Sequence, residues 1–130
     1  MIRPQYHFRP GPHGLRAWNV ARLIRLAEEL PVNDVALSEI SEIDEFYWGN
    51  DPMKVRQVAE HAKLVVEADL ALPILLCAEG RVMDGMHRIA KAWMVGRDAV
   101  PARRFELTPQ PDFEDAEPER LGYDPADFVI

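Results

Sequence analysis

Apolar side chains that recur every three or four residues predict three helices along the chain. The first such pattern covers residues 17–30. A second helix is expected over residues 51–69, with Asp51 as its N-cap and Pro52 at its first helical position. A third helix is expected over residues 86–95, where a glycine follows as a natural stop.

Shorter apolar runs between these helices predict strands. Residues 34–40 alternate between apolar and polar side chains, and residues 72–77 form a continuous apolar run typical of a buried strand. After a Glu-Gly turn, residues 81–83 are expected to return as the partner strand, and residues 99–105 to form the last strand. This order of elements predicts an α+β fold, a small mixed sheet with helices packed on it.

The two ends of the chain lack these periods. Residues 3–14 hold three prolines and two glycines and are expected to form an irregular arm. Its His7 and Arg9 either fold over a ligand or belong to a packing strap. We therefore divide the chain into one compact domain with its arm, residues 1–107, and a proline-rich acidic tail, residues 108–130. Two aromatic residues of the tail are expected to pin it to the body or to a partner: Tyr123 and Phe128.

Composition places the chain among small cytoplasmic proteins. Its 130 residues are 48% hydrophobic, enough for one core, and no apolar run approaches the roughly 20 residues that cross a bilayer. The N-terminal residues lack the apolar stretch of a signal peptide. Cys77 is the single cysteine, which favours a reducing compartment, and we expect it to be a buried apolar residue. The four histidines show no spacing typical of metal ligands, so no metal site is predicted.

The formal net charge of −7 disfavours DNA as a partner. Proteins that bind nucleic acid without sequence preference need clustered Lys and Arg side chains. Much of the acidic excess lies from Glu106 onward, however, and the body is close to neutral. DNA therefore stays a weaker alternative. The oligomeric state is open, with a homodimer among the options.

The segment with the most suggestive chemistry is the strand, turn and helix over residues 82–91. The first N–H groups of a helix have no partner inside it, and the helix dipole adds partial positive charge there, so this end attracts phosphate. Gly85 allows the sharp turn, and Arg88 offers a planar fork suited to phosphate oxygens. Equally, Asp84 is compatible with a simple helix cap and the basic side chains with a solvated surface. The candidate phosphate-binding residues are Asp84, Gly85, Met86, His87, Arg88 and Lys91.

The same segment resembles the ParB/sulfiredoxin superfamily. The stretch Asp-Gly-Met-His-Arg-Ile-Ala-Lys-Ala at residues 84–92 follows Leu-Pro-Ile-Leu-Leu at 72–76 and precedes Val-Pro-Ala at 100–102, and the likeness extends over roughly residues 32–106. The arm and the Tyr47-Trp48 pair are similar to a bacterial subgroup described only as ParB-like. This resemblance implies a nucleotide ligand, ATP, ADP or CTP with Mg²⁺, whose phosphates bind Gly85, His87 and Arg88. It also implies that Asp84 shapes the turn or contacts Mg²⁺ through water.

Three departures limit what the resemblance implies. Met86 stands where sulfiredoxins carry their catalytic cysteine, the helix-turn-helix of partition proteins is missing from this sequence, and the substrate-binding parts of the free-serine kinases are not recognisable. Kinase relatives place a catalytic carboxylate after the first strand, where four stand here: Glu39, Glu42, Asp44 and Glu45. Among them we favour Glu42 and Asp44 as a general base.

Two functions follow from this reading. One is a nucleotide-binding protein, a phosphotransferase acting on a small hydroxyl-bearing metabolite. The alternative is a non-catalytic ParB-like module of the partition or regulatory type that responds to nucleotide or DNA. Whether the chain is an enzyme stays open. Among the remaining residues, His61 is expected to have a structural role. Trp48 and Trp93 are expected to belong to the core, and the alternative for Trp48 is that it stacks on a base.

Overall fold

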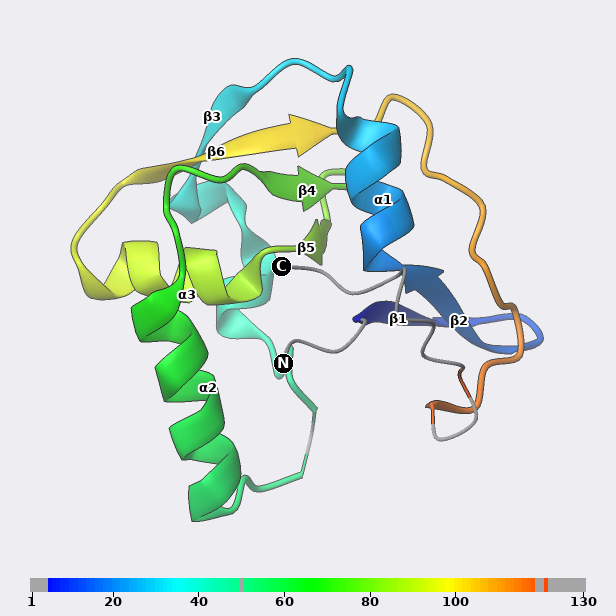
Figure 1. The fold of residues 1–130 in the computed structure, drawn as a ribbon, viewed down its shortest axis with the longest axis horizontal. Coiled ribbons are helices and arrows are strands. Elements are labelled where there is room, and N and C mark those ends of the chain that lie inside the picture. The colour runs from blue at the N-terminus through cyan, green and yellow to red at the C-terminus, as the bar shows by residue number, and fades with distance from the viewer. Residues whose placement is uncertain (1–4, 50, 119–120, 122–130) are drawn as a thin grey trace.

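The computed structural model describes residues 5–49, 51–118 and 121, so the predicted tail anchors Tyr123 and Phe128 lie outside the described residues. It is a mixed α+β structure (Figure 1). Its elements, in chain order, are β1 (Tyr6–Gly11), β2 (Gly14–Asn19), α1 (Val20–Ala27), β3 (Asn33–Ala36), the 3₁₀ turns η1 (Leu37–Glu39) and η2 (Ser41–Asp44), α2 (Val55–Glu67), β4 (Ile74–Leu76), β5 (Val82–Asp84), α3 (Met86–Met94) and β6 (Ala99–Arg104).

A four-stranded sheet in the order β3-β6-β4-β5 forms the centre of the molecule. Strands β4 and β6 run parallel, and the other neighbours run antiparallel, so the sheet is mixed. Along β4, Ile74 and Leu76 join the core on the side of α3, whereas Leu75 and Cys77 join the core on the side of α1. Both faces of the sheet are therefore covered, which explains why this strand is a continuous apolar run. Cys77 is fully buried, as predicted.

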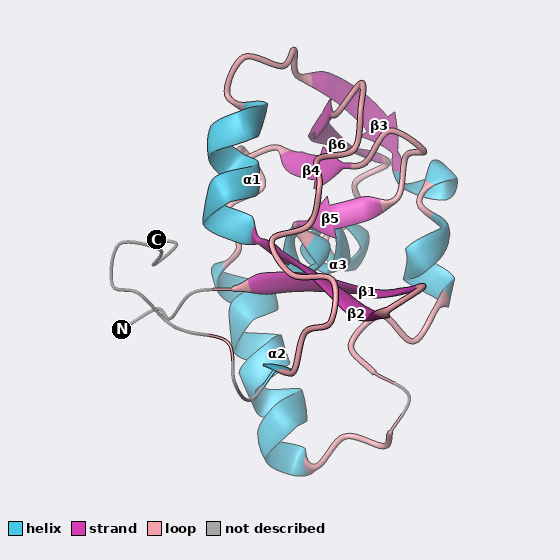
Figure 2. Cartoon of the chain, turned by 90° about the vertical axis from the view of Figure 1, so that its right-hand side faces the viewer, coloured by secondary structure: helices cyan, strands magenta, loops and turns pink. Residues whose placement is uncertain are grey.

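The N-terminal arm is not irregular, as we expected, but forms an antiparallel hairpin. Strand β1 pairs with β2 from Tyr6 opposite Asn19 to Gly11 opposite Gly14. Two of the three prolines that suggested a loop are compatible with the hairpin. Pro12 lies in the turn, and Pro10 pairs with Leu15 next to the last pair of the ladder. The hairpin crosses below the central sheet and forms a separate two-stranded sheet (Figure 2).

The first helix consequently begins later than its periodicity indicated. Ala17 and Trp18, which we assigned to the helix, lie in β2. Helix α1 starts at Val20, because the side chain of Asn19 accepts a hydrogen bond from the Arg22 N–H at 3.2 Å and caps the first turn.

The described part of the tail fastens this hairpin to the body. The backbone of Ala17 donates to the Phe113 carbonyl at 2.8 Å and accepts from the Asp112 N–H at 2.8 Å. The indole Nε1–H of Trp18 donates to the Pro109 carbonyl at 2.7 Å, and Arg22 pairs with Asp112 at 3.0 Å. The described part of the tail thus holds β2 along one edge.

Helix α2 differs most from its prediction. It begins at Val55, so the Asp51-Pro52 pair does not open it. Instead, the Lys54 N–H donates to the side chain of Gln57 at 2.8 Å. None of the residues of α2 is buried, although its apolar stripe predicted a packed face. Figure 1 shows α2 extending away from the sheet beside α3.

Two tryptophans that we assigned to the core are exposed. The side chain of Trp48 is 39% exposed and that of Trp93 is 66% exposed. Helical periodicity placed Trp93 on the apolar face of α3, but the buried residues of this helix are Met86, Ile89 and Ala92. No helix among the described residues is long and apolar enough to cross a membrane.

Candidate functional site

The larger of two cavities described here lies where the hairpin faces the segment after η2 and the start of β5. It has a volume of about 1130 Å³. Three kinds of side chain dominate its walls. These are the arginines Arg9, Arg16 and Arg81, the carboxylates Glu42, Glu45 and Glu79, and the aromatic residues Tyr6, Phe8, Phe46, Tyr47 and Trp48. We refer to this cavity as the cleft.

The guanidinium of Arg9 is the least satisfied group in the cleft. Its Nε–H donates to His7 Nε2 at 2.8 Å, which fixes the proton of the neutral His7 ring on Nδ1. Its terminal Nη2 is buried and has no hydrogen-bond partner, the one such side-chain atom found among the described residues. Burying a donor of a charged group without a partner is unfavourable, so an atom of this kind calls for a functional explanation.

The neutral state of His7 follows from its surroundings. Burial, followed by the charges of Arg9 and Arg16, lowers the pKa of His7 from 6.5 to about 4. A neutral ring can accept the Arg9 hydrogen bond, whereas a protonated ring cannot. His7 therefore supports the position of Arg9 throughout the neutral pH range.

This lowered pKa predicts a loss of stability in mild acid. Between pH 6.5 and about 4 the unfolded chain protonates His7 while the folded protein does not, so the free energy of unfolding decreases as the pH falls through this window. We expect a decrease of about 2 kcal/mol between pH 7 and pH 5, because one proton bound on unfolding changes this free energy by about 1.4 kcal/mol per pH unit. Urea denaturation at both pH values measures it. His7→Gln, which keeps an acceptor for Arg9, should lose this part of the pH dependence, and an unchanged profile in that variant would contradict the assignment.

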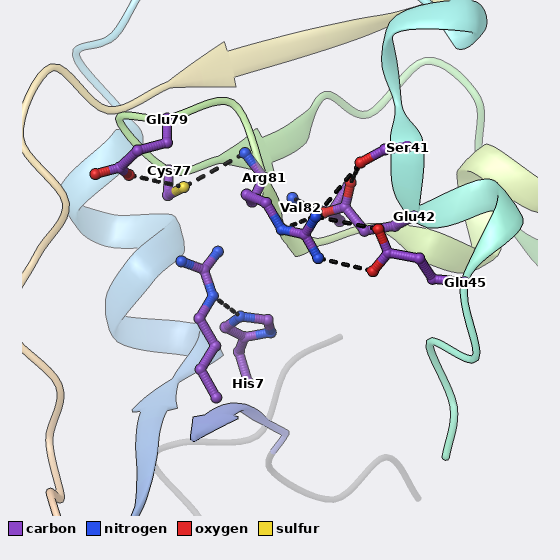
Figure 3. Close-up of polar contacts among 9 residues, drawn as sticks. His7, Ser41, Glu42, Glu45, Cys77, Glu79, Arg81 and Val82 are labelled. Atoms are coloured by element: carbon purple, nitrogen blue, oxygen red, sulfur yellow. Dashed lines mark hydrogen bonds and ion pairs between the residues drawn. The ribbon is translucent and has the colours of Figure 1, made fainter. Parts of the chain in front are cut away.

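Across the cleft from His7, Glu42 and Arg81 form a structured network (Figure 3). Glu42 is 3% exposed, and its Oε2 accepts a hydrogen bond from the Val82 N–H at 2.5 Å and lies 3.7 Å from Arg81 Nε. Arg81 in turn donates to both carboxylate oxygens of Glu45, at 2.8 and 3.1 Å. Because β5 is an edge strand, the Glu42 carboxylate occupies a backbone donor that would otherwise face the cleft.

Tyr47 also lines the cleft. Burial, followed by the carboxylates of Asp84 and Glu42, raises the pKa of the Tyr47 hydroxyl to about 12. Tyr47 therefore stays a neutral phenol, a hydrogen-bonding group and not a base, at any physiological pH.

The structure separates the four candidate carboxylates. Glu42 and Glu45 line the cleft, Asp44 lines a smaller neighbouring cavity but not the cleft, and Glu39 lines neither. Glu42, one of our two preferred bases, uses its carboxylate to hold the edge of β5. Its surroundings fit a structural role at least as well as a catalytic one.

The predicted phosphate-binding turn is well formed but is engaged with the protein itself. Arg88 pairs with Asp84 at 2.8 Å and donates to the carbonyls of Leu72 and Pro73 at 3.2 and 2.5 Å. Lys91 donates to the carbonyls at the end of α2, Val66 at 2.9 Å and Ala68 at 2.7 Å. Of the six predicted residues, Met86 lines the smaller cavity and the other five line neither of the two cavities.

His87, also in this turn, is covered by other rings. Its Nε2 lies 2.8 Å from Nδ1 of His61 on α2, and the ring of Trp48 stacks on it with centroids 5.0 Å apart. Burial, then His61 and Arg88, lower the pKa of His87. His61 is half-buried and joins α2 to α3, which agrees with the structural role expected for it.

Gly85 has a packing reason as well as a conformational one. Its φ is +109°, and a Cβ at this position would lie 2.6 Å from Cγ2 of Ile74. We expect Gly85→Ala to lower the free energy of unfolding by about 2 kcal/mol, from backbone strain and overpacking together. Gly96→Ala is the matched control, because Gly96 has a φ of +82° and open space around it, so only the backbone cost of about 1 kcal/mol remains. Equal losses in urea denaturation of the two variants would contradict the steric account.

Sequence reasoning missed most of the cleft. Arg16, Glu79 and Arg81 had no motif around them. The arm did show aromatic and basic residues at alternate positions, Tyr6 to Arg9, which is a strand signal that its prolines obscured. Alternation on both sides of the turn at residues 11–14 would have predicted the hairpin and placed its side chains on common faces.

The described residues contain no group of three or more His, Cys, Asp or Glu side chains placed to hold a metal ion. Asp84, which we expected to contact Mg²⁺ through water, is paired with Arg88. No protein-family model, curated protein or solved structure matches this chain, so the ParB/sulfiredoxin resemblance stays a prediction.

Proposed function

We propose that this protein binds a nucleotide in the cleft, with the phosphates at Arg9. The observation that carries this proposal is the buried Nη2 of Arg9, a charged donor that has no partner within the described part of the protein. A phosphate oxygen is a strong acceptor for a guanidinium, and such a pair in a partly buried cleft contributes more than an exposed one.

The other two arginines of the cleft also favour an anionic ligand, but neither has a buried donor without a partner among the described residues. Arg16 donates to the Pro10 carbonyl at 3.1 Å, and Arg81 is held by Glu45. Arg16 adds positive charge to the cleft, whereas Glu42 and Glu45 offset the charge of Arg81. The ligand's charged end is therefore placed at Arg9 and its neighbour His7, on the hairpin.

The aromatic wall supports a ligand that also carries a planar ring. Trp48 lies at the side of the cleft with 39% of its side chain exposed, and Tyr47 is adjacent to it. Stacking on such side chains is the common way in which proteins hold a base without reading its edges. The cleft volume of about 1130 Å³ is sufficient for a nucleotide.

The resemblance to the ParB/sulfiredoxin superfamily independently suggests a nucleotide ligand, ATP, ADP or CTP, and a ParB-like fold is part of the proposal. We place the phosphates differently from what that resemblance implies, because the donors of Arg88 have internal partners. We also restrict the proposal to binding. The three carboxylates that line the cleft, Glu42, Glu45 and Glu79, all have hydrogen-bond donors from the protein.

Isothermal titration with ATP, ADP and CTP, each with and without Mg²⁺, tests this proposal. We expect saturable binding of at least one of the nucleotides, and much weaker binding of the matching nucleoside, which lacks phosphate. The titrations with and without Mg²⁺ show whether the metal contributes to binding, since Mg²⁺ bound with a nucleotide is held mainly by the phosphates and one or two carboxylates. The absence of binding by all three nucleotides at millimolar concentration would refute the proposal.

A further inference from the structure

A second, smaller cavity lies on the other side of the wall formed by Tyr47 and Trp48. Its volume is about 390 Å³, and it is bounded by the η2 segment and by α3. The two cavities share Glu42, Glu45, Tyr47 and Trp48. The remaining walls differ, so the two cavities suit different ligands.

The charges around the smaller cavity are all negative. Glu42, Asp44 and Glu45 line it, whereas no Arg, Lys or His side chain of the described residues does. Glu42 and Glu45 are partly neutralised by Arg81, but no ion pair of Asp44 is found in the described part of the chain. Asp44 is thus the carboxylate with its charge available to a ligand.

The rest of the lining is apolar and aromatic. Ile43, Met86, Ile89 and Ala90 form its floor, and the rings of Tyr47, Trp48 and Trp93 stand around it. Trp93 is 66% exposed, so its ring is accessible to a ligand in this cavity. Aromatic faces beside a carboxylate are the arrangement that proteins use to hold organic ammonium ions.

We propose that the smaller cavity binds an organic ammonium ion, a cationic amine on an apolar body of a few carbon atoms. The amine faces Asp44 and the aromatic rings, and the carbon chain lies on the floor formed by α3. A bare metal ion is a poor alternative, because the described carboxylates are not grouped to coordinate one. This site is separate from the nucleotide proposal, and each can fail without the other.

Titration with n-butylammonium chloride, followed by the indole N–H signals in ¹H–¹⁵N spectra, tests this assignment. We expect the signals of Trp93 and Trp48 to shift. The Trp18 signal should stay in place, because its indole is buried and bonded to Pro109. The neutral analogue 1-butanol should bind at least about tenfold more weakly, and the anion butyrate should cause no shift. Equal affinity for butylammonium and butanol would overturn the proposal, since it would indicate an apolar groove without selection for charge.

Two variants locate the site. Asp44→Asn should weaken butylammonium binding about threefold and Trp93→Leu about fivefold, the latter followed by the backbone amide of Ala90. Both side chains are exposed, so the fold should be retained. Glu39→Gln is the control, because Glu39 is exposed in the preceding turn and lines neither cavity, and its affinity should equal that of the wild type. Wild-type affinity in both test variants would also overturn the proposal.

Discussion

Replacing Arg9 by methionine is expected to weaken nucleotide binding about a hundredfold while changing the melting temperature little. Hydrogen bonds to a charged partner contribute up to about 3 kcal/mol, which corresponds to this loss of affinity. The stability of the unliganded protein should respond differently. Methionine removes a buried donor that has no partner, which offsets the lost hydrogen bond to His7 and the lost contact of the guanidinium with the Trp18 ring.

Two comparisons make the Arg9 result specific. Arg25→Met removes an exposed arginine of α1 that lies outside the cleft, and it should bind nucleotide with wild-type affinity. Arg9→Lys should retain part of the binding, because an ammonium keeps the charge but not the planar fork. Titration calorimetry and thermal melts of the three variants measure both quantities. A large drop in melting temperature with unchanged affinity would show that Arg9 is a structural residue.

Most of the central sheet and α3 were predictable because local sequence determines them. Strand β3 is the exception, since it was predicted to run to Ile40 but ends at Ala36, where the 3₁₀ turn η1 begins. The apolar run of β4, the turn after it and the helical period from Met86 onward are each set by residues close in the chain, and all were predicted within one to three residues at their ends. The start of α1 was wrong by three residues because Trp18 fits a helical period and a strand equally well. Only the pairing of β2 with β1, and the tail bound along its edge, decide between them.

The cleft could not be predicted from patterns within short stretches of the sequence. His7, Glu42 and Arg81 come from three separate parts of the chain, and their proximity depends on how the hairpin lies against β5. Arg88 shows the opposite difficulty. The sequence correctly marks the turn, but it cannot show that the carbonyls of Leu72 and Pro73 are close enough to occupy the guanidinium. Whether a basic side chain is available to a ligand is a tertiary property.

The hairpin is held both by the core and by the tail. Trp18 of β2 is 1% exposed and packs in one core cluster with Leu75 and Met83. The tail adds hydrogen bonds to β2 through Asp112, Phe113 and Pro109. The opposite wall, with Glu42 and Val82, belongs to the edge of the central sheet. The cleft therefore has two walls, the hairpin with the proposed ligand-binding residue Arg9 and the edge of the central sheet with Glu42. We expect a substitution in the first wall to change nucleotide binding and one in the second to change stability.

For the core wall, we expect Glu42→Ala to lower the free energy of unfolding by about 3 kcal/mol. The variant leaves the Val82 N–H of β5 buried without an acceptor and opens space beside it, and an unpaired buried donor costs about 1–3 kcal/mol before the lost packing is counted. The half-exposed Arg81 contact, at 3.7 Å, adds little because solvent screens it. Urea denaturation monitored by tryptophan fluorescence measures the change.

Glu42→Gln distinguishes the role of the Glu42 side chain as a hydrogen-bond acceptor from the role of its negative charge. The glutamine oxygen still accepts from Val82, so the variant should lose only about 1 kcal/mol, and Asp44→Ala, two residues later and exposed, should be within about 0.5 kcal/mol of the wild type. We expect this order of stability losses if the role of the Glu42 carboxylate is to accept the hydrogen bond from the Val82 N–H of β5. A general base would give another pattern, in which Glu42→Gln abolishes turnover of a bound nucleotide without affecting stability. If Glu42→Ala were as stable as the wild type, the structural assignment would be wrong and the catalytic interpretation of Glu42 would regain its place.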